Sequence, residues 1–264
     1  MNTSRISPVE AARRIWRERY GDARVVFLAG SVLRGEATPA SDLDIVVAYE
    51  RLPHARREAF VFEGWPVEAF VQDPETLAHF FETERRRGLP ALMSMLIEGV
   101  EIPETCEFSA GLKRAASRLF EAGPERWDED ELRFRRYRLT DWLDDIRHPR
   151  APEELVATGA YLYQDAADFF LRSRGLWSAH SKTIPRSLQK TDEAFAEKFR
   201  RAFEALFVEK RAAHVIALVE EMLEPFGGLL FDGFRRDAKP EERKTLDTQI
   251  ERRGINKDRQ DAQD

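Results

Sequence analysis

Two aspartates, Asp42 and Asp44, are separated by one apolar residue and open an apolar run of the sequence. Because successive strand residues point to opposite faces, both carboxylates are expected on one face of a strand. Such a pair suits a hard divalent cation, and Mg²⁺ typically takes one or two carboxylates together with substrate phosphates. An earlier apolar run ends at Gly30 and Ser31, and ten residues separate Ser31 from Asp42. At this Gly-Ser turn, phosphate oxygens could approach backbone N–H groups and a hydroxyl. The pattern predicts a site for a metal-bound nucleoside triphosphate.

The motif G-S-x10-D-x-D resembles the signature of the polymerase-beta-like nucleotidyltransferase superfamily. With Arg34, Gly35 and the Ser41-Asp42 pair, it is similar to small bacterial members of that superfamily. Those include the aminoglycoside adenylyltransferases and the minimal nucleotidyltransferase antitoxins. The resemblance implies Mg²⁺-dependent transfer of a nucleoside monophosphate, with ATP as the expected donor and a hydroxyl group as the acceptor.

The same resemblance implies roles for individual residues. Asp42 and Asp44 would hold the metal ion. The residues expected to bind the nucleotide are Gly30, Ser31, Arg34, Ser41 and, far along the chain, Lys182.

The family pattern also requires a third carboxylate on a neighbouring strand. Residues 59–72 read AFVFEGWPVEAFVQ, which predicts two short strands joined by a turn at residues 63–66. Glu68 stands inside the second strand, where an unpaired carboxylate is costly to bury unless it binds a metal. The competing reading is an edge-strand surface carboxylate, and Glu63 is a second candidate beside the turn. In the family, the Glu68 position is either a metal ligand or the base that takes the acceptor proton.

A second Asp-x-Asp, Asp128 to Asp130, lies in WDEDELRFRRYR without an upstream Gly-Ser or a following apolar strand. Acidic residues favour the first turn of a helix. This copy is therefore predicted to start a helix and to have no part in the site.

Length and periodicity predict an α+β fold with two units. Residues 1–105 are expected to form a catalytic domain with a small mixed sheet and flanking helices. Residues 106–234 are expected to form an all-α bundle, and residues 235–264 a polar tail. The bundle helices are predicted at 107–122, 126–147, 152–173, 191–208 and 210–224.

Composition restricts the partners. The net charge of −6 argues against bulk binding of nucleic acid, which needs phosphate neutralisation. The single cysteine, Cys106, excludes an intrachain disulfide framework and a cysteine-rich zinc site. The start of the chain lacks an apolar signal region, and the apolar runs are too short to span a membrane. A cytoplasmic protein is therefore expected.

The helical half resembles the C-terminal bundles of kanamycin-type nucleotidyltransferases, which close one side of the cleft and bind the acceptor. Asp141 and Asp145 lie at i, i+4 on one helix face and could meet a cationic acceptor. The alternative is that they pair with Arg138 or Arg147.

Lys182 lies in GLWSAHSKTIPR, a polar interruption predicted between two helices. It resembles a lysine that related adenylyltransferases place against the triphosphate, where an ammonium would neutralise the leaving pyrophosphate. An ordinary surface lysine is the alternative.

Three other functions stay open. The acceptor could be a protein, as the antitoxin resemblance implies, or the chain could bind a nucleotide as a regulator without turnover. Arg174 and His180 have the R-x5-H spacing of a HEPN-like ribonuclease, although Gly175 replaces the polar residue that usually follows the arginine.

Overall fold

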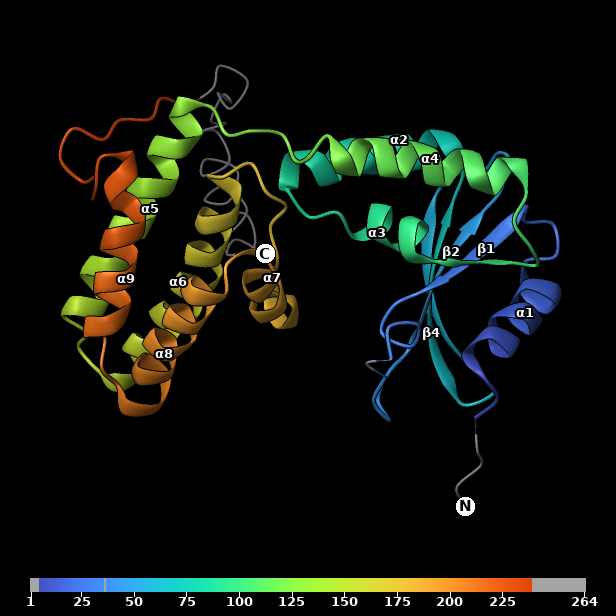
Figure 1. Ribbon diagram of the computed structural model, residues 1–264, viewed down its shortest axis with the longest axis horizontal. Helices are drawn as coiled ribbons and strands as arrows, with labels where there is room; N and C mark the ends of the chain where they lie inside the picture. Colours follow the sequence, from blue (N-terminus) through green and yellow to red (C-terminus); the bar gives the residue numbers. More distant parts are fainter. Residues whose placement is uncertain (1–4, 36, 239–264) are drawn as a thin grey trace, which may run out of the picture.

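The computed structural model describes residues 5–35 and 37–238 (Figure 1). Its strands are β1 (Val25–Ala29), β2 (Leu43–Ala48), β3 (Arg56–Phe62), β4 (Trp65–Gln72) and β5 (Val100–Ile102). Its α-helices are α1 (Pro8–Arg19), α2 (Pro74–Arg87), α3 (Ala91–Glu98), α4 (Glu107–Glu121), α5 (Glu129–Arg147), α6 (Pro152–Arg172), α7 (Ile184–Thr191), α8 (Glu193–Glu209) and α9 (Ala213–Leu223). Two short 3-10 helices are η1 (Ser181–Thr183) and η2 (Glu224–Phe226).

The strands form one mixed sheet in the order β3-β4-β2-β1-β5. The central pair, β2 and β4, is parallel, and the other three pairings are antiparallel. Helix α1 packs on one face of the sheet, where Ile15 meets the buried side chains of Leu28 and Ile45. Helices α2, α3 and α4 cover part of the opposite face (Figure 1). The fold is α+β, as the sequence predicts.

Local signals set the helix boundaries. The hydroxyl of Ser7 accepts a hydrogen bond from the Glu10 N–H, and Pro8 occupies the first turn of α1. Asp73 and Thr76 form a reciprocal capping box at the start of α2. Helix α5 starts at the predicted acidic cluster, where the Asp128 carboxylate accepts from the Glu131 N–H at 2.7 Å.

The hairpin turn is shorter than predicted. It consists of Glu63 and Gly64, both with positive φ (46° and 81°), and strand β4 already begins at Trp65. Two residues with positive φ make the tight turn that matches the twist of paired strands. Trp65 is buried and its indole N–H donates to the Ile6 carbonyl at 3.0 Å. That burial keeps it in the strand.

Helices α5 to α9 form a second core of their own, centred on buried residues such as Phe169, Phe199 and Leu206. Helix α4 does not join them. Its Leu112 and Ala116 are buried against α2, α3 and the sheet, although the predicted boundary at 105/106 assigns this helix to the bundle. By packing, the change from one core to the other falls between α4 and α5.

Helix α7 replaces part of the predicted polar interruption. Pro185 occupies the first turn of α7, where its missing N–H leaves no bond unmade. Ile184 and Leu188 fix α7 to the helical core.

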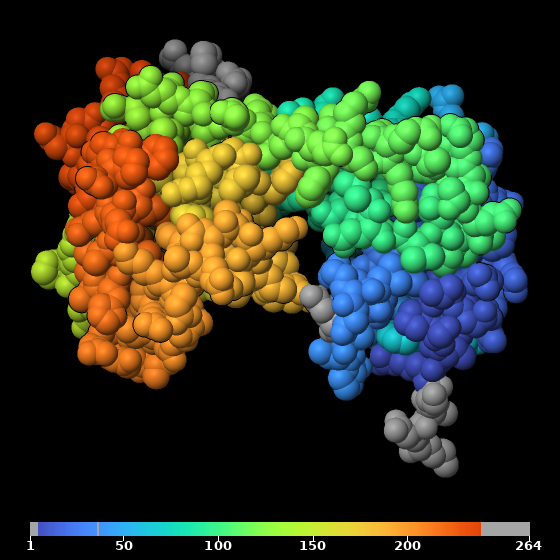
Figure 2. Space-filling view, in the orientation of Figure 1, coloured from blue at the N-terminus to red at the C-terminus, as the bar shows by residue number. Residues whose placement is uncertain are grey.

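The two cores meet through a joint at the ends of α2, α4 and α6. The Ser178 N–H donates to the Gly88 carbonyl at 2.7 Å, and the Trp177 indole N–H to the Phe120 carbonyl at 2.9 Å. Arg172, only 4% exposed, donates to the Glu125 carbonyl at 2.5 Å. Figure 2 shows the two parts joined along this side and separated by a hollow on the other.

Residues 239–264 of the predicted polar tail lie outside the described residues. Within residues 5–35 and 37–238, no helix is both long enough and apolar enough to cross a membrane.

Candidate active site

The end of β1 and the start of β2 bring glycine and aspartate together. Gly30 has φ +87°, a conformation that favours glycine, and its carbonyl accepts from the Leu33 N–H in the turn that follows. A Cβ atom at Gly30 would lie 2.4 Å from Oδ2 of Asp44. The bare backbone of Gly30 thus makes the space in which the Asp44 carboxylate lies.

Sheet register brings the third carboxylate to the same place. In the parallel pair, Asp44 stands opposite Glu68, and on its other side Asp44 pairs with Ala29. One carboxylate oxygen from each of Asp42, Asp44 and Glu68 lies within 4.8 Å of the other two. All three residues are half-buried. They are named here the acidic triad.

The acidic triad has the donor chemistry of a site for a hard divalent cation. Oxygen ligands suit Mg²⁺, and three clustered carboxylates repel one another unless a cation lies between them. Because Gly30 has no side chain, the Asp44 carboxylate has room beside the backbone. The residues present therefore fit a Mg²⁺ ion.

The pKa of Asp44 reflects its burial and the two neighbouring carboxylates. Burial, followed by the charges of Asp42 and Glu68, raises the pKa of Asp44 to about 6. The cations Lys182 and Arg34 act in the opposite direction and lower it. Asp44 therefore lies within electrostatic reach of two residues predicted to bind the triphosphate.

Lys182 reaches this neighbourhood from the helical part of the chain. It belongs to η1, directly before α7, the labelled helix of the second core nearest the sheet in Figure 1. The loop is held from α6 by Gln164, which donates to the Ala179 carbonyl at 2.8 Å and accepts from the Ser181 N–H at 3.3 Å. Ser181 has φ +49°. The hydrogen bonds of Gln164 and the positive φ of Ser181 thus set the conformation of the loop that carries Lys182.

The remaining predicted nucleotide-binding residues lie in the segment between β1 and β2. The Ser31 hydroxyl, half-buried, donates to the Ser41 hydroxyl at 3.3 Å. Ser41 is buried and also accepts from the Thr38 N–H at 2.8 Å, so it closes the loop. Arg34 forms an ion pair with Glu98 of α3 at 3.1 Å.

Glu63, the competing carboxylate, lies away from the triad. It pairs with Arg14 of α1 at 2.8 Å, on the hairpin turn. Glu68 pairs instead with Arg57 of β3, a residue outside the predicted strands. The strand alternation of β3 could have identified it, because residues 57, 59 and 61 share the sheet face of Glu68.

The structure does not bring Asp141 and Asp145 to the triad. They lie on α5, which Figure 1 shows on the side of the helical core away from the sheet. The two arginines that were the alternative partners of Asp141 and Asp145 pair with other residues. Arg138 pairs with Asp165, and Arg147 pairs with Asp144 and Glu220. Burial and its acidic neighbours raise the pKa of Asp141. Acceptor binding by these residues stays a prediction.

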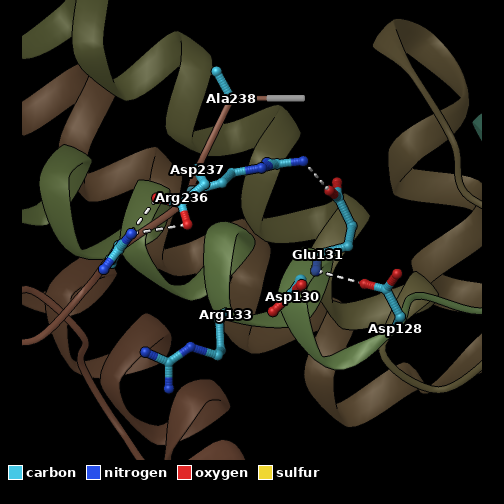
Figure 3. Close-up of a pocket in the computed structure, with 8 residues that line it drawn as sticks. Asp128, Asp130, Glu131, Arg133, Arg236, Asp237 and Ala238 are labelled. Atoms are coloured by element: carbon cyan, nitrogen blue, oxygen red, sulfur yellow. Dashed lines mark hydrogen bonds and ion pairs between the residues drawn. The ribbon is translucent and has the colours of Figure 1, made fainter. Parts of the chain in front are cut away.

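A cavity of about 790 Å³ lies elsewhere, between the start of α5 and the segment near Asp237 (Figure 3). Part of its charged lining is paired internally: Arg236 with Glu131 at 3.1 Å and Arg235 with Asp237 at 2.8 Å. Paired surface charges of this kind require no ligand. The acidic triad is the stronger candidate for chemistry.

A small mixed sheet with three clustered carboxylates beside a Gly-Ser turn is the arrangement that the sequence motif predicts. Residues 9–99 match the family model described as a nucleotidyltransferase domain, and this range contains the turn and the whole triad. This match is consistent with the polymerase-beta-like superfamily that the motif resembles.

The other comparisons concern the whole chain. Among solved structures, it is similar to a nucleotidyltransferase-like protein from Exiguobacterium sibiricum, with 14% identity and a TM-score of 0.42. That similarity covers 82% of this chain and 74% of the other. A comparison with curated proteins gave no match.

Proposed function

We propose that this protein transfers AMP from ATP to a hydroxyl group of a small-molecule acceptor, with Mg²⁺ as cofactor. The observation that carries the proposal is the acidic triad, whose oxygens lie within 4.8 Å of one another beside the Gly30 turn. A domain of the matched family acts on a nucleoside triphosphate. A cytoplasmic location would supply both ATP and Mg²⁺.

In this proposal, the phosphates of ATP lie at the end of β1. Gly30 lets a phosphate oxygen approach the backbone closely, and the Ser31 hydroxyl would turn from Ser41 toward that oxygen. Lys182 and Arg34, whose charges already act on Asp44, would neutralise the triphosphate and the leaving pyrophosphate. The buried Ser41 would keep the loop in shape.

The acceptor hydroxyl would attack the α-phosphorus of ATP. A new P–O bond forms to the acceptor, the bond to the β-phosphate oxygen breaks, and pyrophosphate leaves. When bound, Mg²⁺ neutralises phosphate charge and favours ionisation of the attacking hydroxyl. Asp42 and Asp44 would hold that ion. Glu68 would complete the metal site or take the acceptor proton.

The acceptor would bind in the hollow between the two parts of the chain (Figure 2). The net charge of −6 suits a cationic or neutral acceptor better than an anionic one. Asp141 and Asp145 are the acidic pair proposed to contribute, and they would need an acceptor long enough to reach α5. Transfer to a protein is the alternative acceptor class, and regulation without turnover is the alternative to catalysis.

The test is incubation of the protein with Mg²⁺ and each α-labelled triphosphate, together with a metabolite extract or an aminoglycoside panel. Label appearing on a small molecule, with ATP preferred and with none formed by Asp44→Asn, is the expected result. Label on a protein band would favour the antitoxin-like alternative. Tight ATP binding without labelled product in any mixture would contradict the transferase proposal and favour the regulator.

A further inference from the structure

Strand β3 supplies a cation to the acidic triad. The guanidinium of Arg57 donates to Oε2 of Glu68 at 2.5 Å. In the register of the hairpin, Ala59 stands opposite Glu68, so Arg57 is the diagonal neighbour of Glu68 on the same sheet face. Arg57 also lies over the Phe70 ring, 4.8 Å from its centroid. A stacked and hydrogen-bonded guanidinium has a defined position.

This ion pair competes with the proposed metal ion for the same carboxylate. Glu68 is one of three carboxylates whose oxygens converge, and the Arg57 contact occupies one of its oxygens. A guanidinium at that position also repels a nearby dication.

The pair is nevertheless open to exchange. The side chains of Arg57 and Glu68 are 60% and 34% exposed. Ion pairs with that much exposure are weak and are readily replaced.

We propose that Arg57 is a positioning residue that holds Glu68 while the site lacks metal and releases it when a divalent ion enters with the triphosphate. The inference rests on the proposed function, because it needs the acidic triad to bind metal. Arg57 thereby lowers the affinity of the free protein for the ion. The triphosphate, which brings its own negative charge, restores that affinity. The metal therefore enters with the nucleotide rather than before it.

The neighbouring residue provides a matched control. Arg56 belongs to the same strand, points to the opposite sheet face and pairs with Glu58 at 2.7 Å. Its side chain is 45% exposed, against 60% for Arg57. Removing either arginine changes the net charge equally, but only Arg57 contacts the triad.

The experiment measures Mn²⁺ binding without nucleotide, from the loss of the free-ion electron paramagnetic resonance signal. Arg57→Ala is expected to lower the Kd for Mn²⁺ by roughly three- to tenfold, because a contacting cation is removed. Arg56→Ala should change it by less than about twofold, since solvent and salt screen a cation on the far face. Arg57→Lys should stay close to the wild type. In the Glu68→Gln background, the effect of Arg57→Ala should fall to that of Arg56→Ala.

Two results would overturn the inference while leaving the proposed function intact. One is an equal change in Arg57→Ala and Arg56→Ala, which would show a general charge effect. The other is an undiminished Arg57→Ala effect in the Glu68→Gln background, which would show that Arg57 does not act through Glu68. Failure of both the wild type and Arg57→Ala to bind Mn²⁺, with ATP as well as without it, would overturn both the inference and the metal site.

Discussion

A Cβ atom built on Gly30 would lie 2.4 Å from Oδ2 of Asp44, closer than any real Cβ contact. The Asp44 carboxylate therefore fits in its place only because residue 30 is a glycine. Spacing in the sequence suggests this relationship, and the register of β1 on β2 produces it.

Gly30→Ala is expected to displace the Asp44 carboxylate and to remove transfer activity and metal binding together. The backbone strain at φ +87° would also cost about 1 kcal/mol of stability. Gly35→Ala is the matched control, because Gly35 has φ +71° and a Cβ there would meet nothing within 4 Å. Mn²⁺ titration and chemical unfolding of both variants separate the two effects. Equal loss of metal binding in both would mean that loop strain, and not the Asp44 contact, is responsible.

The raised pKa of Asp44, about 6, makes the metal-free protein sensitive to pH. Between the ordinary aspartate pKa of about 4 and pH 6, the folded state keeps a proton that the unfolded state loses. The free energy of unfolding should therefore fall as pH rises through this window, by about 1–2 kcal/mol after allowing for solvent exposure.

Glu84 is half-buried, and burial raises its pKa to about 7, which gives a slope of the same sign. The informative quantity is therefore the difference between wild type and Asp44→Asn in urea unfolding from pH 4 to 7. Parallel curves would show that Asp44 has an ordinary pKa.

Glu68→Gln keeps the shape of the side chain and removes its charge. Loss of a metal ligand or a general base is expected to lower kcat by about 10²–10⁴-fold. Glu63→Gln, on the hairpin turn and paired with Arg14, should leave the rate unchanged. Steady-state kinetics with the acceptor found by the labelling assay give the comparison, and equal rates for both variants and the wild type would remove Glu68 from the site.

Gly88→Ala is expected to disturb the joint between the two cores. A Cβ atom there would lie 1.8 Å from Nη1 of Arg172, in addition to the strain of φ +75°. Gly123 has a similar φ of +78°, but its Cβ would lie 3.5 Å from the nearest atom, the Gly175 carbonyl oxygen. We expect chemical unfolding to show a loss of about 2–4 kcal/mol for Gly88→Ala and about 1 kcal/mol for Gly123→Ala. Equal losses would mean that Arg172 moves aside freely.

The shared face of Asp42 and Asp44 was predictable from strand alternation, and the resemblance to a known family implied a third carboxylate, Glu68, on a neighbouring strand. Other features were not predictable, because they depend on partners in space. The apolar stripe of α4, with Leu112 and Ala116, predicts a helix but does not say that the sheet covers it. Pro185 can end a helix or begin one, and only the packing of Ile184 and Leu188 decides. Arg57 was hidden because β3 opens with charged residues and reads as a loop.

The central claim is that Asp42, Asp44 and Glu68 form one site for a metal-bound triphosphate, and thermal unfolding tests it without knowledge of the acceptor. A ligand that binds only the folded state adds about 2.7 kcal/mol at a hundredfold excess over Kd. Mg²⁺ and ATP together should raise the Tm clearly, either alone should raise it less, and Asp42→Asn/Asp44→Asn should abolish the joint effect. An unchanged Tm for the wild type with Mg²⁺ and every triphosphate, or a full shift in the double variant, would contradict the account.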